Sequence, residues 1–227
     1  MKIDKQNILH DIANHLLLNA GNMANNGLLH GKMGPVLFFH LYGRYTSKHF
    51  YSDYADLLLE EVLQGLDESM NVSLENGLAG IGWGIEFLAQ NDFIEGDTGE
   101  MLQDLNWVIM KNFNPVYAIG SHSQTELEGV LFYLNTHLSS CKRESFYPNF
   151  ERSYLESLYR QISQKQYKGT VFEFFCQLFK KPQIKQERIT IPVQWYRDIS
   201  MSIENIANRP LGIYNGLSGL GIKLMCL

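Results

Sequence analysis

One histidine and one carboxylate stand where they could do acid–base chemistry. His30 lies in the glycine-rich stretch 26–34, and an imidazole titrates near neutral pH, so it could donate or accept a proton. Glu86 lies in an apolar segment, where a carboxylate must be paired or hydrated, and Gln90 follows on the same helical face. We expect His30 and Glu86 to be catalytic and Gln90 to bind substrate. The structural alternatives are a loop histidine bonded to a carbonyl and an ion pair from Glu86 to an outer helix.

Further side chains in the glycine-rich stretches could bind substrate. Lys32 could hold an anion, and Trp83 could offer a stacking surface. Tyr214 and Asn215 open the last of these stretches and are expected to contact substrate as well. An exposed, solvated lysine and a tryptophan packed between helix ends are the alternatives.

Sequence motifs for other chemistries are absent. The chain has no H-E-x-x-H, C-x-x-C, G-x-x-x-x-G-K-[ST] or G-x-S-x-G, so we expect no metal and no cofactor. Its cysteines, Cys141, Cys176 and Cys226, are too few for a disulfide framework and suit a reducing compartment. No secretory signal is recognisable at the N-terminus, and we expect a cytoplasmic protein.

The glycine-led apolar runs form a repeat. They begin at Gly34, Gly84, Gly129, Gly169 and Gly219, at spacings of 50, 45, 40 and 50 residues. Longer amphipathic segments alternate with them, at 5–20, 53–66, 97–111, 149–164 and 193–208. A weak alternation at 188–193 contains Pro192, which argues against a long strand.

This alternation predicts an all-α fold. Amphipathic outer helices would pair with apolar inner helices in about five hairpins, arranged like an α/α toroid within a single domain, 1–227. The inner helices would run parallel, so that their N-termini and glycine-rich loops meet at one mouth.

Composition and charge limit the partners. The chain has 227 residues, of which 45% are hydrophobic, and its net charge of −5 argues against nucleic-acid binding. No segment approaches the roughly 20 apolar residues of a membrane span. Thirteen acidic and no basic residues occupy 53–104, whereas ten basic and five acidic residues occupy 142–188. These are solvated faces, or they bind a cationic peptide or a second copy of the chain.

Three stretches resemble a known family. They read NGLLHGKMG at 26–34, LENGLAGIGWG at 74–84 and YNGLSGLG at 214–221. They are similar to the lanthionine synthetase C-like family, whose members carry a G-x-x-H-G-x-x-G element and repeated G-L-A-G-I-G loops at the inner helices of an α/α toroid. The resemblance implies that fold, and His30 matches the motif histidine.

The cyclases of that family use zinc to activate a cysteine thiol, which adds to a dehydrated Ser or Thr of a precursor peptide. Two Cys and one His hold the metal, in W-C-x-G and C-H-G loops. Here Trp83 is followed by Gly84, and no cysteine is followed by histidine. The resemblance therefore implies the fold without the zinc site.

The first functional hypothesis is a zinc-less accessory or peptide-binding protein in the maturation of a ribosomally synthesised peptide. Its partner would be a peptide substrate or a maturation enzyme. A divergent cyclase-type enzyme using His30 and Glu86 is the alternative. A carbohydrate-active toroid enzyme is the third, and it would need two carboxylates, for which Glu75 is the other candidate.

Overall fold

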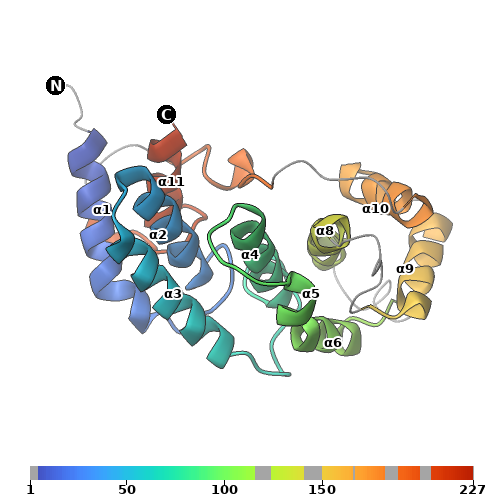
Figure 1. The fold of residues 1–227 in the computed structure, drawn as a ribbon. Coiled ribbons are helices and arrows are strands. Elements are labelled where there is room, and N and C mark those ends of the chain that lie inside the picture. Colours follow the sequence, from blue (N-terminus) through green and yellow to red (C-terminus); the bar gives the residue numbers. More distant parts are fainter. Residues whose placement is uncertain are drawn as a thin grey trace. The chain divides into compact units, whose positions relative to one another are not determined.

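The computed structural model describes residues 5–115, 124–140, 150–165, 167–181, 189–199 and 206–226. Within these ranges the regular elements are helices and no strand forms, which confirms the predicted all-α class (Figure 1). None of the helices in this part of the chain is long and apolar enough to cross a membrane. The chain divides into two compact units, Met1–Asp67 with Ile191–Leu227, and Glu68–Thr190. Each is described by itself, and the single domain stays a prediction.

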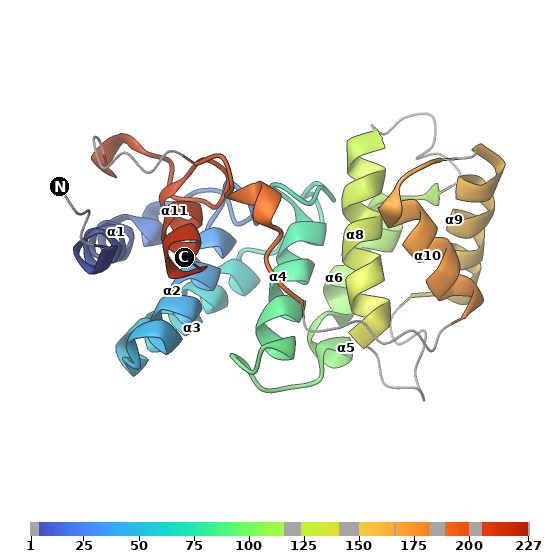
Figure 2. The same ribbon diagram turned by 90° about the horizontal axis from the view of Figure 1, so that it is seen from above.

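The first unit is built around two buried, glycine-led helices. α2 (Met33–Thr46) and α11 (Leu217–Cys226) are apolar on nearly all sides, and α1 (Lys5–Asn19) and α3 (His49–Gln64) cover them (Figure 2). The apolar positions of α3, four residues apart, face α2, as the sequence predicts. α2 ends at Ser47, which takes a left-handed conformation with φ 55°.

α2 and α11 run parallel and in close contact. Gly34, near the start of α2, lies against Gly212 and Ile213, just before α11 begins. One turn further along each helix, a Cβ atom on Gly221 would stand 2.2 Å from the Phe38 ring. Glycine therefore allows the two helices to approach more closely than any side chain would permit.

The second unit repeats this arrangement. α4 (Leu78–Gln90) and α8 (Gln124–Ser140) are both buried. Leu74, just before α4, lies beside Gly129 of α8, and Glu86, further along α4, lies beside His137, further along α8, which shows that the two helices run parallel. The outer helices are α5 (Thr98–Met101), α6 (Gln103–Asn112) and α9 (Arg152–Lys165). The helix expected at 97–111 is thus divided at Leu102, whose side chain is fully buried.

The fourth glycine-led helix, α10 (Thr170–Lys180), departs from the apolar character expected of an inner helix. It buries Phe172, Phe175 and Leu178 but exposes Glu173, Gln177 and Lys180. Its neighbours are α8 and α9. α10 is therefore amphipathic and has one face in solvent.

The prediction of a fifth outer helix at 193–208 is wrong over the described residues of that range. Residues Val193–Trp195 form one 3-10 turn, a further turn follows to 198, and a second 3-10 helix covers Ile206–Asn208. The ammonium of Lys223 bonds the carbonyls of Arg197 and Ile199 at 2.5 and 2.9 Å. Those carbonyls would accept the bonds of a continuing helix, so tertiary contacts have replaced them.

Candidate functional site

The predicted site residues fall into two sets. His30, Lys32, Tyr214 and Asn215 belong to the first unit, whereas Trp83, Glu86 and Gln90 belong to the second. Each set is built by its own loops and helices, and their roles in binding or catalysis stay predictions.

Two glycine-rich loops pack together at the N-terminal end of α2 and α11. The amide of Tyr214 donates to the carbonyl of Leu29 at 3.0 Å. A Cβ atom on Gly212 would lie 2.3 Å from that same carbonyl, so only glycine allows this approach. Asn215 takes a left-handed conformation with φ 54°, which turns the chain into α11. Loops separated by almost the whole sequence therefore form one surface.

That surface carries His30 and Tyr214 side by side. Their ring centroids are 5.6 Å apart and the planes meet at 78°, an edge-to-face contact. Both side chains are exposed, with 47% of Tyr214 accessible to solvent. Asn215 is exposed beside them. An aromatic ring, an imidazole and an amide are therefore exposed together to solvent.

Lys32 is neither exposed nor open to an anion. Its ammonium lies 2.7 Å from Oε2 of Glu61 on α3, and the side chain is 9% exposed against 50% for the glutamate. The ion pair fastens the start of α2 to an outer helix. No sequence pattern predicts this partner, which lies twenty-nine residues further along the chain.

Glu86 is fully buried at the centre of a polar network. Oε1 accepts a hydrogen bond from Nδ1 of His137 at 2.6 Å, and Oε2 accepts from Ser140 at 2.9 Å and from Gln90 at 3.2 Å. The carboxylate is thus paired, as its burial requires, but with the inner helix α8 rather than with an outer helix. The side-chain amide of Gln90, which was expected to bind substrate, donates one of its hydrogen bonds to Glu86.

The network continues beyond His137. Its Nε2 lies 3.2 Å from Nδ2 of Asn106 on α6, and the Asn106 carbonyl oxygen accepts from the Tyr133 hydroxyl at 2.5 Å. The amide that donates to Nε2 and the carboxylate that accepts from Nδ1 favour the tautomer with its proton on Nδ1. Glu86, His137, Asn106 and Tyr133 therefore form one buried chain across α4, α8 and α6.

Trp83 is fully buried and packs between aromatic rings. Its ring lies 5.7 Å from Phe87 and 5.9 Å from Phe132, between centroids. This is the packed arrangement that the sequence left open as an alternative to a stacking surface.

The sequence reasoning missed the partners of Glu86. The sequence does not predict that His137 and Ser140 donate to Glu86, or that Asn106 and Tyr133 extend the network from His137. A signal did exist, because a carboxylate in an all-apolar helix requires a buried donor, and His137 sits in the next apolar helix. Which donor faces it depends on the register of α4 against α8, which no local pattern encodes.

The described residues do not fit the zinc site of the lanthionine synthetase C-like cyclases. In this part of the chain no three His, Cys, Asp or Glu side chains gather as metal ligands. Cys176 is half-buried, and burial raises the pKa of its thiol, whereas Cys226 is exposed; Cys141 lies outside the described residues.

Comparisons with known proteins give no independent assignment: no protein-family model, no curated protein and no solved structure matches the chain.

Proposed function

We propose that this chain is a zinc-less lanthionine synthetase C-like protein that binds a peptide during the maturation of a ribosomally synthesised product. It acts as an accessory protein in the cytoplasm and adopts a toroid-like arrangement of about five hairpins. The parallel pairs α2–α11 and α4–α8, each closed by glycine contacts, support this arrangement.

The observation that carries the proposal is the exposed pair of His30 and Tyr214. It stands where two glycine-rich loops meet, at the N-terminal ends of two buried helices. Tyrosine is enriched at binding hot spots, since its ring covers apolar surface while the hydroxyl forms a hydrogen bond. A peptide side chain can lie on the ring, and its backbone amides can bond to the imidazole and to Asn215.

The state of Glu86 favours binding over acid–base catalysis. Three donors surround the carboxylate, and its side chain is inaccessible to solvent. A general acid or base must reach the proton that it transfers. Glu86 is instead committed to holding α4 against α8.

The test is the affinity for short peptides encoded beside the gene, labelled with fluorescein and titrated with the purified chain by fluorescence anisotropy. Tyr214→Ala should weaken binding by about 5–30-fold, the range expected when a hot-spot tyrosine loses about 1–2 kcal/mol. Tyr45→Ala is the matched control, because Tyr45 belongs to the same unit and is 46% exposed against 47% for Tyr214.

Unchanged affinity in Tyr214→Ala, or equal losses in both variants, would place the binding surface elsewhere. Absence of binding to every such peptide would overturn the proposed function itself.

A further inference from the structure

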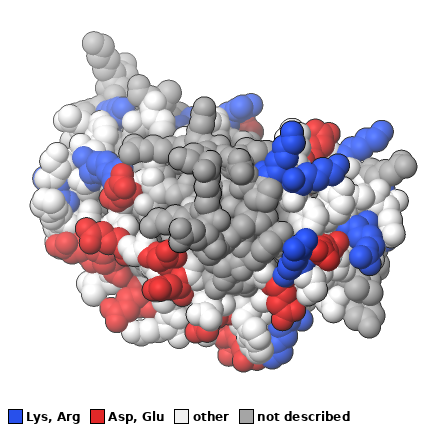
Figure 3. Space-filling view, turned by 45° about the vertical axis from the view of Figure 1, so that its right-hand side comes forward, with Lys and Arg blue, Asp and Glu red and all other residues white. Residues whose placement is uncertain are grey.

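Basic side chains gather on the hairpin formed by α9 and α10. Residues 150–181 contain six Lys or Arg and three Glu, in a chain whose net charge is −5. Figure 3 shows this excess of Lys and Arg on the surface that the two helices form, and Asp and Glu side chains over α3. The two helices therefore present a positive surface within an acidic protein.

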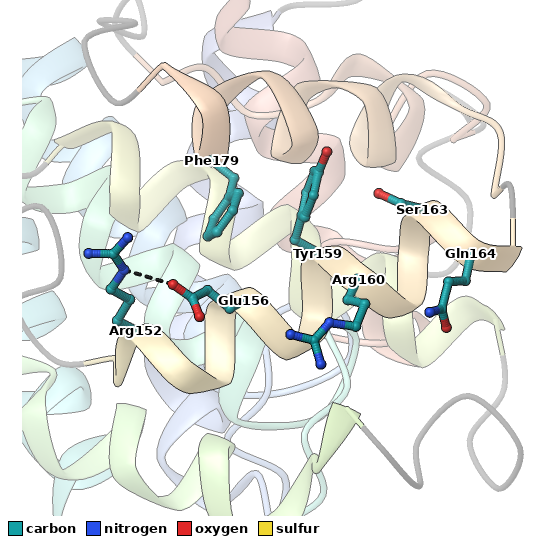
Figure 4. Close-up of a pocket in the computed structure, with 7 residues that line it drawn as sticks. All are labelled: Arg152, Glu156, Tyr159, Arg160, Ser163, Gln164 and Phe179. Carbon is teal, nitrogen blue, oxygen red and sulfur yellow. Dashed lines mark hydrogen bonds and ion pairs between the residues drawn. The ribbon is translucent and has the colours of Figure 1, made fainter.

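An open groove of about 510 Å³ runs along this hairpin (Figure 4). Arg152 and Arg160 line it from α9, and the rings of Tyr159 and Phe179 form its apolar wall, stacked with centroids 4.8 Å apart. Arg152 donates to Glu156 at 2.8 Å. No carboxylate of the described residues pairs with Arg160.

The exposed face of α3 has the opposite character. Phe50 and Leu57 are 61% and 59% exposed, and they lie seven residues apart on one face of the helix. Two exposed carboxylates occupy the same face: Asp53 lies between Phe50 and Leu57, and Glu60 follows Leu57. Large apolar side chains placed singly on a surface need no explanation, but two on one face with two carboxylates form a helix surface suited to a groove.

The other two acidic side chains of α3 lie beside residues of their own unit. Asp56 lies 3.5 Å from His40, and Glu61 forms the ion pair with Lys32. Asp53 and Glu60 are the carboxylates exposed on the face of Phe50 and Leu57, and Glu60 accepts a hydrogen bond from Gln64 at 3.1 Å that solvent can replace.

We propose that α3 of one copy of this chain docks into the α9–α10 groove of a second copy. Asp53 and Glu60 are about 10 Å apart along their helix, and Arg152 and Arg160 are about 12 Å apart along theirs, so two ion pairs can form together. Phe50 and Leu57 then cover the rings of Tyr159 and Phe179. This surface is separate from the His30–Tyr214 pair and does not depend on the proposed peptide binding.

The contact joins two different surfaces, so it is heterologous. Each copy keeps one free α3 face and one free groove, and association continues into rings or open chains. The mean mass should rise with protein concentration, and it should fall at 1 M salt, where the Debye length drops to about 3 Å.

A charge-swap experiment tests the pairing, with sedimentation velocity as the measurement. The acidic-face variant is Asp53→Lys with Glu60→Lys, and the groove variant is Arg152→Glu with Arg160→Glu. Each variant alone should associate at least about tenfold more weakly than the parent chain, because both attractions become repulsions. An equimolar mixture, or all four substitutions in one chain, should associate again. Asp11→Lys and Arg197→Glu are the controls, since both residues are exposed and lie outside these surfaces.

Misfolded variants could not associate again when they are mixed, so recovery in the mixture excludes misfolding as the cause of the loss. Circular dichroism of each variant is the second control and should show an unchanged helix content. A parent chain that stays monomeric at every concentration would overturn the proposal. So would variants that associate as the parent does, or a mixture that fails to recover. A groove that binds an acidic peptide while the chain stays monomeric would assign it to another partner.

Discussion

Replacing Glu86 with alanine should lower the free energy of unfolding by about 3–5 kcal/mol, the cost of breaking a buried pair. The variant leaves the Nδ1 proton of His137 without its carboxylate acceptor, whereas the Ser140 hydroxyl keeps the carbonyl of His137 as an acceptor at 2.7 Å. Each buried donor left unsatisfied costs about 1–3 kcal/mol, and the lost side-chain volume adds a cavity term. Glu86→Gln keeps the shape and one acceptor oxygen, so we expect a smaller loss of about 1–2 kcal/mol.

The assay is urea unfolding of the purified chain at neutral pH, followed by circular dichroism at the helical minimum. Glu95→Ala is the control, because that glutamate is exposed in the same unit, and its removal should change stability by less than about 0.5 kcal/mol. If the two units unfold in separate transitions, only the transition of the second unit should move.

An unchanged or increased free energy of unfolding in Glu86→Ala would refute the structural role of Glu86. A residue kept for catalysis is commonly held at a cost in stability, so its replacement tends to leave stability unchanged or raised. An alanine variant as stable as the parent would therefore revive the prediction that Glu86 acts on a substrate.

Three further predictions follow from other buried contacts. Burial, reinforced by the charge of Arg44, lowers the pKa of His40 to about 4, against 6.5 in the unfolded chain. The unfolded state therefore takes up the proton first, and stability should fall by up to about 3 kcal/mol between pH 6.5 and 4. Urea midpoints across that range should show this loss, and His40→Gln should flatten the profile. Gly221→Ala should cost about 1–3 kcal/mol, since the new methyl group meets the Phe38 ring, and Phe38→Leu should recover part of it in a double-mutant cycle. Tyr133→Phe removes a buried donor from Asn106 and should cost about 1–2 kcal/mol by the same measurement, whereas no change would exclude that bond.

The helices themselves were predictable from local patterns. The four-residue spacing of apolar side chains locates α3 to within a few residues at either end. The glycine-led runs locate α2, α4, α8 and α11, because the runs are apolar on nearly all sides and are mostly buried. A helix that is buried on most sides must carry apolar side chains on most sides, so its burial can be predicted from its sequence.

The contacts between helices were not predictable in this way. Glu86 meets His137 across 51 residues of chain, and Lys32 meets Glu61 across 29. Several charged residues in each region could have served as partners. The choice depends on how far one helix is displaced along the next, and that displacement is set by packing at glycine contacts such as Gly82 against Tyr133.

The described residues 193–199 show the opposite failure, in which a helical pattern was present and was overridden. Trp195, Tyr196 and Ile199 are buried and have helical spacing. Lys223 nevertheless binds two carbonyls in this segment. A charge-assisted hydrogen bond is stronger than a backbone one, so the segment gains more from α11 than from its own helix.

A polar side chain six residues after the leading glycine recurs in three of the buried helices, and the structure gives it a common physical task. His40 approaches Asp56 of α3, Gln90 donates to Glu86, and Asn135 donates to the carbonyl of Val171 in α10. His40 and Asn135 reach a neighbouring helix, and Gln90 supports the carboxylate that does so. Asn135 and Glu86 make hydrogen bonds to the neighbouring helix, and a displacement by one turn would break these bonds as well as the glycine contacts. These polar positions therefore act together with the glycine contacts in setting the register of each inner helix against its neighbour.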